Sequence, residues 1–219
     1  DHGDGYPRGA ALTVYKGDDL IDNPNMYLIF PVKGGGIGMN YTGMTIGGLE
    51  ISDSRYLVAV SSIDQDHYDD SKEKNIFLIA VDKDDPAGAP GLTQVTNYGE
   101  GSGHYVTNPQ LVKISPDLFA VMWEEGKEGG TVKTVFFDGE GSRLGTSAPG
   151  SFAGSLSDCQ PVVCGDKVIW YVTDGQNLTF YSYPAEFPGS DSDLQVSRTV
   201  LKQKGSSGSG GGSGSGGGS

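Results

Sequence analysis

The chain has 219 residues and an acidic composition, with 28 Asp and Glu residues against 15 Lys and Arg residues and a formal net charge of −13. Nucleic acid is not expected as a partner, because neutralising phosphates requires a basic surface. Membrane insertion is not expected either, because no stretch of the sequence reaches the roughly 18 apolar residues of a membrane span.

Short apolar runs recur along the chain and are separated by Gly, Asp, Asn and Pro. The runs are rich in Val, Ile, Tyr, Phe and Thr, and none keeps a helical period for long, so the pattern predicts an all-β protein. They repeat as sets of four at intervals of about fifty to sixty residues, which is typical of the four-stranded antiparallel blades of a β-propeller. An immunoglobulin-like sandwich is the main alternative, but it predicts no internal repetition.

The first 39 residues match the second half of a repeat. The opening "DHGDGYPRG" aligns with "EEGKEGG" and "TDGQN" of later repeats, so it is predicted to be a turn between a second and a third strand. The segment "RGAALTVYK" then supplies a third strand and "MYLIFPVK" a fourth. We therefore predict a partial blade over residues 1–39, without its first strand and most of its second.

Three fuller repeats follow. Residues 40–104 contain the strands "GGLEIS", "YLVAVSSID", "NIFLIAVDK" and "LTQVTNY". Residues 105–155 contain "PQLVKI", "LFAVMWEE", "TVKTVFFD" and a weaker fourth run around Arg143 to Thr146. Residues 156–204 contain "PVVCG", "VIWYVTD", "NLTFYSYP" and "DLQVSRTVLKQ". Only Gly and Ser occupy residues 205–219, which predicts a disordered linker of engineered origin.

These repeats amount to about three and a half blades, whereas known propellers close with at least four. An open propeller would expose unpaired strand edges. We therefore expect another chain, another segment or a symmetry mate to complete the ring. A four-bladed ring closed by the last strand of this chain is the alternative.

An ordered set of motifs carries a resemblance over roughly residues 1–184. The motifs are "HGDGYPR", "GGLEIS…AVSSIDQ", "NIFLIAVDK", "VTNY", "NPQLVKIS…VMWEE", "VFFDGEG" and "LSDCQPVV…VIWYVT". As a set, they resemble the β-propeller repeats of large secreted or cell-surface proteins of gut Firmicutes. The resemblance implies a bacterial protein with a propeller fold and a secreted or cell-surface location, but no particular chemistry.

The loops between second and third strands open on the same face of a propeller as the loops between blades. One of these inter-blade loops is predicted to be "SFAGSLSD", and all three histidines lie in such loops. Tyr rings there would stack on a ligand, and Asp, Asn and Glu oxygens would accept hydrogen bonds. The predicted ligand-binding residues of this loop face are His2, Asp4, Tyr41, Asp64, Asp66, His67, His104, Tyr105, Asn108, Glu124 and Asp158.

The same loops suggest metal sites. The segment "IDQDHYDDSKEK" spaces carboxylates closely, as calcium-binding loops do, although it lacks the glycine and the distal Glu of an EF-hand. A solvated acidic loop is the competing interpretation. The calcium candidates are Asp64, Asp66, Asp69 and Asp70. Zinc binding by His2 with Asp4, or by His67 with Asp66, would need further ligands from elsewhere, and no other cofactor is indicated.

The sequence favours a non-enzymatic binding or adhesion module that recognises a glycan or a surface protein through the acidic loop face. A glycosidase-like enzyme is one alternative, because such propellers place two or three carboxylates near the central axis. Asp158, at the start of an inner strand, is then the candidate catalytic residue. The equivalent positions in the other blades are Asn108 and Thr45 or Gly47, which are not acids. A structural scaffold, which binds only through blade-to-blade closure, is the other alternative.

Two further residue pairs give expectations about packing. If the segment between Cys159 and Cys164 is extended, their Cα atoms are about 16 Å apart, which is too far for a disulfide. Two free cysteines are therefore expected. Trp123 and Trp170 occupy comparable positions in second strands, so they are expected to pack between blades.

Overall fold

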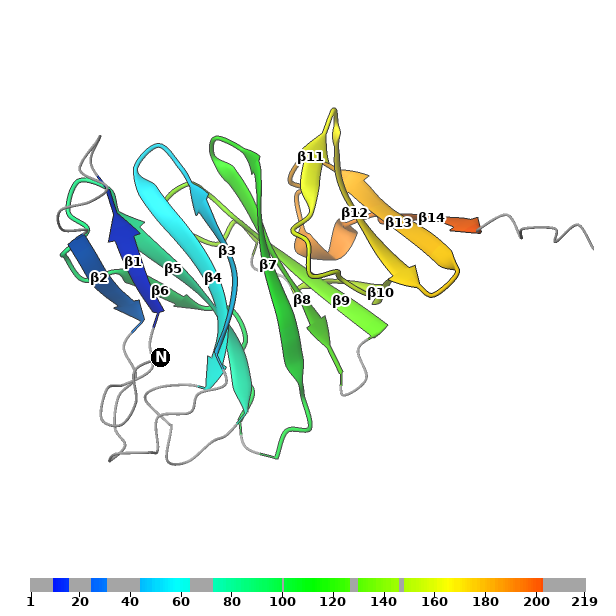
Figure 1. Cartoon of the computed structure of the whole chain (residues 1–219), viewed down its shortest axis with the longest axis horizontal. Helices are drawn as coiled ribbons and strands as arrows, with labels where there is room; N and C mark the ends of the chain where they lie inside the picture. The colour runs from blue at the N-terminus through cyan, green and yellow to red at the C-terminus, as the bar shows by residue number, and fades with distance from the viewer. Residues whose placement is uncertain are drawn as a thin grey trace, which may run out of the picture.

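The ranges that the computed structural model describes are 10–15, 25–30, 44–63, 73–99, 101–126, 130–145 and 148–202 (Figure 1). Within them the protein is all-β, as predicted, with one short 3-10 helix, Asp191–Asp193. The strands form one two-stranded and three four-stranded antiparallel sheets. Strands that follow one another in a sheet also follow one another in the chain. None of the described sheets closes into a barrel or a ring.

The four sheets succeed one another along the chain. The first sheet consists of β1 (Ala10–Val14) and β2 (Asn25–Phe30). The second consists of β3 (Thr45–Ile51), β4 (Arg55–Ile63), β5 (Lys74–Asp82) and β6 (Gly91–Gln94). The third consists of β7 (Val106–Ser115), β8 (Leu118–Glu125), β9 (Gly130–Phe137) and β10 (Gly150–Gly154). The fourth consists of β11 (Val162–Cys164), β12 (Lys167–Asp174), β13 (Asn177–Pro184) and β14 (Ser197–Lys202).

The fourth strand of the third sheet lies later in the chain than predicted. We expected this strand around Arg143 to Thr146, but Arg143 forms only an isolated bridge with Phe137. The strand that pairs with β9 is β10. Part of the segment predicted as the loop "SFAGSLSD" is therefore a strand, since Ser151–Gly154 belongs to β10.

A tight turn after β9 explains this difference. One carboxylate oxygen of Asp138 accepts hydrogen bonds from the backbone N–H groups of Glu140 and Ser142. After this turn the Leu144 N–H donates to the Phe136 carbonyl oxygen, and the side chain of Arg143 reaches Asp191 of the 3-10 helix. The strand that pairs with β9, β10, begins at Gly150.

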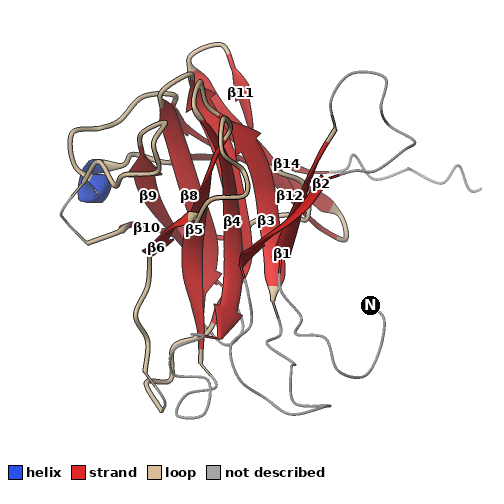
Figure 2. Cartoon of the chain, turned by 90° about the vertical axis from the view of Figure 1, so that its left-hand side faces the viewer, coloured by secondary structure: helices blue, strands red, loops and turns tan. Residues whose placement is uncertain are grey.

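Alternating side chains give the central strands two apolar faces. In β4, Leu57 and Ala59 pack toward the third sheet, whereas Val58 and Val60 pack toward the first. The side chains of β8 divide between the second and fourth sheets in the same way. Burial on both faces explains why these strands are continuous apolar runs in the sequence. The sheets therefore stack face to face in chain order, as Figure 1 shows, and Figure 2 looks along this series from the side of the first sheet.

Both tryptophans lie between sheets, as predicted. Trp123 is buried against the second sheet and Trp170 against the third. The indole N–H of Trp170 donates to the carbonyl oxygen of Ser155 at 2.9 Å, and its ring stacks on Tyr181 with centroids 5.2 Å apart. Each tryptophan faces the preceding sheet, so comparable positions in two repeats make comparable contacts.

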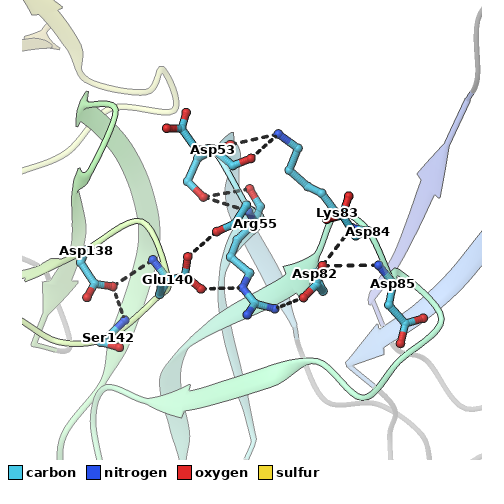
Figure 3. A network of polar contacts seen from close by, with 11 residues as sticks. Asp53, Arg55, Asp82, Lys83, Asp84, Asp85, Asp138, Glu140 and Ser142 are labelled. Carbon is cyan, nitrogen blue, oxygen red and sulfur yellow. Dashed lines mark hydrogen bonds and ion pairs between the residues drawn. The ribbon is translucent and has the colours of Figure 1, made fainter.

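A polar network joins the hairpin end of the second sheet to the turn after β9 (Figure 3). Arg55 Nη1 lies 2.8 Å from Asp82 Oδ2, and Arg55 Nε lies 3.0 Å from Glu140 Oε2. The hydroxyl of Ser54 donates to the other carboxylate oxygen of Glu140. The Ser54 hydroxyl, followed by Arg55, lowers the pKa of Glu140. Since these groups pair with one another across two sheets, we assign the network to sheet packing.

The cysteines are free and exposed, in agreement with the expectation from their spacing. Cys164 ends β11, whereas Cys159 lies in the segment before that strand. No helix in the described ranges is long and apolar enough to cross a membrane.

Candidate functional site

A pocket lies where the first strands of the three four-stranded sheets come together. It has a volume of about 320 Å³ and is formed by β3, by β7 and by the segment that leads into β11. We call it the first-strand pocket. Its lining residues are Thr45, Ile46, Gly47, Gly48, Asn108, Pro109, Gln110, Asp158 and Gln160.

Two glycines allow β3 to approach its neighbours at this point. A Cβ atom on Gly47 would lie 2.3 Å from the carbonyl oxygen of Pro109, and a Cβ atom on Gly48 would lie 1.9 Å from Gln160 Nε2. Gly48 also has a backbone φ of +141°, a value that residues other than glycine rarely adopt. A bulge interrupts β3 between Ile46 and Gly48, so glycine is required where the three sheets meet.

A network of amide groups forms the wall on the β7 side. Asn108 has a φ of +49° at a bulge in β7, and its Nδ2 donates to the carbonyl oxygen of Ser157 at 3.3 Å. Gln110 Nε2 donates to Asn108 Oδ1 at 2.9 Å and to Ser157 O at 3.1 Å. Gln110 is only 4% exposed, and its Oε1 is buried with no hydrogen-bond partner among the described residues. The pocket wall therefore contains an unsatisfied acceptor.

The segment that leads into β11 contributes an amide and a carboxylate. Gln160 Nε2 donates to the main-chain carbonyls of Gly47 and Leu111, at 3.3 and 3.1 Å, and so joins three sheets at one point. Asp158 is exposed and is the one carboxylate among the described lining residues. The pocket thus offers a hydroxyl, amides and one negative charge beside an apolar Ile46 side chain. Sites of this composition suit a polar ligand that donates hydrogen bonds.

The pocket residues occupy equivalent positions in successive repeats. Asn108 and Gln110 lie near the beginning of β7, whereas Asp158 and Gln160 lie in the segment just before β11, and each pair has one residue between its members. At the start of β3, glycines stand where the other two repeats have glutamines. The three repeats therefore bring equivalent residues together at one point, and the glycines of β3 leave space for a ligand on the β3 side of the pocket.

The end of β8 carries two carboxylates that face opposite ways. Glu124 Oε1 accepts a hydrogen bond from the backbone N–H of Leu156, in the segment before β11. Glu125 Oε1 lies 2.9 Å from His104 Nδ1, and its Oε2 accepts a hydrogen bond from the Tyr98 hydroxyl at 3.0 Å. The rings of Tyr98 and His104 stack with centroids 4.2 Å apart. Burial, followed by the hydrogen bond to Glu125 and the charge of that residue, raises the pKa of Tyr98 to about 12.

The structure brings together some of the predicted ligand-binding residues. Asn108 and Asp158 both line the first-strand pocket, and Glu124 holds the segment that leads to Asp158. His104 and Tyr105 do not line the pocket; they lie beside Glu125, where Gly126 N–H donates to the Tyr105 carbonyl oxygen. The predicted site residues outside the described ranges are His2, Asp4, Tyr41, Asp64, Asp66, His67, Asp69 and Asp70.

The predicted metal sites also fall outside the described ranges, because every calcium and zinc candidate belongs to those residues. Within the part of the chain that the structure describes, no group of three or more His, Cys, Asp or Glu side chains could hold a metal ion. Calcium binding therefore stays a prediction for residues 64–70.

Sequence reasoning missed the two glutamines of the pocket and the partners of Glu125. A signal for the glutamines was present, since "NPQ" and "DCQ" occupy aligned positions in two repeats with the same spacing. Tyr98 and Glu125 had no such signal, because they are 27 positions apart.

Comparison with known proteins found no matching family model, no matching curated protein and no matching solved structure. The resemblance to surface-protein repeats of gut Firmicutes therefore remains a hypothesis drawn from the motifs.

Proposed function

We propose that the chain is a β-propeller module that binds a neutral glycan in the first-strand pocket without transforming it. The observation that supports this proposal is the convergence of equivalent strand starts on one polar pocket. Asn108, Asp158 and Gln160 bring amides and a carboxylate to it from two repeats, and the glycines of β3 leave room for a ligand. Ligand sites of propellers commonly lie where inner strands meet the central axis.

The propeller interpretation is supported by the repeated sheets. Three consecutive four-stranded antiparallel sheets, each in simple strand order, stack face to face and place their first strands side by side. A propeller has the same arrangement, with the first strand of each blade innermost. The described sheets form an open series, so the proposal requires further sheets to complete a ring.

The chemistry of the pocket supports a neutral ligand. Sugar hydroxyl groups donate to carboxylate and amide oxygens, and the Asp158 carboxylate and the unsatisfied Gln110 Oε1 supply such acceptors. The negative charge of Asp158 and the net charge of −13 disfavour sialylated or sulfated glycans. Glycoside hydrolysis uses a pair of carboxylates, and among the described lining residues Asp158 is the single acid. Binding therefore explains the described pocket better than hydrolysis.

The proposed setting of this module is the bacterial cell surface or the secreted fraction, where it would act in adhesion. The motif resemblance is the support for this location. A surface-protein ligand would use the same exposed pocket rim, and it becomes the preferred ligand if glycans fail to bind.

A glycan array followed by calorimetry tests the proposed ligand. The wild type is expected to bind neutral glycans in preference to acidic ones, and Asp158→Asn is expected to weaken that binding at least about tenfold, the effect of a lost charge-assisted hydrogen bond. Asp166→Asn is the matched control, because Asp166 is an exposed carboxylate at the other end of β11. The proposal fails if Asp158→Asn binds as the wild type does. It also fails if the wild type hydrolyses a bound glycan and Asp158→Asn abolishes the turnover.

A further inference from the structure

The two ends of the stack of sheets present apolar faces that nothing in the described chain covers. On the first sheet, pairing in β1 and β2 puts Thr13 beside Met26 and Ala11 beside Leu28, on the side away from the second sheet. Met26 is 73% exposed, and Leu28 and Tyr15 are also exposed. We call this surface the leading face; its residues are Ala11, Thr13, Tyr15, Met26 and Leu28.

The fourth sheet has a face of the same kind. Trp170 and Tyr181 point back to the third sheet, so the alternate residues of the same strands point away from it. Tyr171 pairs with Phe180, and the two rings lie 6.1 Å apart. Tyr171 is 43% exposed. We call this surface the trailing face; its residues are Val162, Ile169, Tyr171, Leu178, Phe180 and Leu201.

We propose that the trailing face binds the leading face of a second copy of this chain. The proposal rests on the repeated architecture assigned above. Each of the three interfaces inside the chain joins the trailing side of one sheet to the leading side of the next, through a buried apolar cluster. A head-to-tail contact between copies continues that series with the same kind of surface. Figure 1 shows the two faces at opposite ends of the stack, so neither face can cover the other within one chain.

The distribution of charge favours a second copy over a partner recruited by electrostatics. The whole chain carries a net charge of −13, and a basic partner would be drawn to the acidic surfaces. The described positions of the leading face carry no charge, and those of the trailing side carry only Lys167, at the hairpin end. Two acidic chains therefore approach best through these two faces, where no like charges meet. A head-to-tail contact forms a closed ring if its rotation closes and a chain of copies if it does not.

Light scattering and sedimentation equilibrium over a range of protein concentrations test the contact. The wild type is expected to associate into dimers or longer head-to-tail oligomers. Met26→Glu and Tyr171→Glu are each expected to be monomeric, because each places a charge at the centre of one face. Both side chains are exposed in the single chain, so the variants should keep the wild-type circular dichroism spectrum.

Mixing the two variants is the decisive experiment. Met26→Glu keeps an intact trailing face and Tyr171→Glu keeps an intact leading face, so an equimolar mixture should form a one-to-one dimer that neither forms alone. A wild type that remains monomeric at all concentrations overturns the proposal, and so does either variant that still dimerises by itself. Glycan binding is read separately on the same proteins, because the first-strand pocket shares no residue with either face. A failure of this proposal therefore leaves the ligand proposal standing, and the reverse also holds.

Discussion

Arg143 Nη2 lies 3.0 Å from Oδ2 of Asp191, and this pair fixes the 3-10 helix before β14 against the third sheet. Asp191 is completely buried, and its other carboxylate oxygen accepts a hydrogen bond from the backbone N–H of Phe136 at 3.3 Å. The space around the carboxylate is tight, since a Cβ atom on Gly145 would lie 2.6 Å from Oδ2. The Asp191 carboxylate thus accepts hydrogen bonds from two donors of the neighbouring sheet, the Arg143 guanidinium and the Phe136 N–H, in place of water.

Replacing Asp191 with alanine should therefore destabilise the protein. The substitution leaves the partly exposed guanidinium and the buried Phe136 N–H without this acceptor, and a buried donor left without its partner costs about 1–3 kcal/mol of unfolding free energy. Denaturant unfolding followed by tryptophan fluorescence measures the loss. Asp193→Ala is the control, because Asp193 lies in the same helix but is exposed. Equal losses in the two variants would show that the buried pair contributes nothing.

The same pair shows why one strand could not be predicted from sequence. The residues around Arg143 follow a glycine-rich turn and read locally as a weak fourth strand. The competing partner, Asp191, lies 48 positions later in the chain, and nothing in the local pattern indicates it. The central strands β4, β5 and β8 are long apolar runs buried on two sides, so their local pattern and their tertiary contacts agree.

The first-strand pocket could also be predicted only in part from the sequence. The phase of the repeat was enough to pair Asn108 with Asp158 as equivalent strand starts, and the structure places both in one pocket. It could not show that Gln110 turns inward beside Asn108, because that depends on a bulge and on a positive φ at Asn108. Single-residue irregularities of this kind decide which side of a strand a side chain occupies.

Because β3 approaches β7 closely at Gly47, replacing this glycine with alanine should strongly destabilise the protein. In Gly47→Ala the new methyl group would overlap the Pro109 carbonyl oxygen, which is main chain and cannot rotate away. We expect a loss of about 1–3 kcal/mol of stability, as for overpacking elsewhere, together with weaker glycan binding as the pocket wall shifts. Thermal unfolding and calorimetry measure the two effects. Gly91→Ala is the control, because the nearest atom to its Cβ would lie 3.6 Å away, in ordinary contact. Wild-type behaviour of Gly47→Ala would contradict the packing described here.

The network around Arg55 predicts a dependence of stability on acid pH. The pKa of Glu140 is lowered by Ser54 and Arg55, and that of Asp82 is lowered by the backbone N–H of Asp84 and by Arg55. For a carboxyl group whose pKa is lower in the folded state, the stabilisation is present above the unfolded-state pKa, about 4, and is lost as pH falls through the folded-state pKa. The melting temperature should therefore fall as pH decreases below about 4.

In Arg55→Gln the melting temperature should fall less steeply as pH decreases, because the guanidinium charge no longer lowers the pKa values of Glu140 and Asp82. Melting temperature against pH, compared between wild type and variant, is the measurement. Arg198→Gln removes a positive charge from the exposed strand β14 and is the control for a change in net charge. Parallel pH profiles for the wild type and Arg55→Gln would show that the network does not couple to stability.

The contact between Tyr98 and Glu125 predicts an ionisation at unusually high pH. The pKa of Tyr98 is raised to about 12 by burial, by the hydrogen bond to Glu125 and by the charge of that residue. The difference in tyrosinate absorbance between the wild type and Tyr98→Phe, recorded after a stopped-flow pH jump that is faster than unfolding, isolates this one phenol. Its signal should rise near pH 12 rather than near the ordinary tyrosine value of about 10.

Glu125→Gln should move this ionisation to lower pH while leaving it above the ordinary value, because the charge is removed but the burial remains. Glu124→Gln is the matched control, since the neighbouring carboxylate accepts its hydrogen bond from Leu156 on the other side of β8. The raised pKa also stabilises the fold below pH of about 10, and this contribution should be lost as pH rises toward the folded-state value. An ionisation of Tyr98 near pH 10 in the wild type, or one that Glu125→Gln leaves unchanged, would contradict the contact.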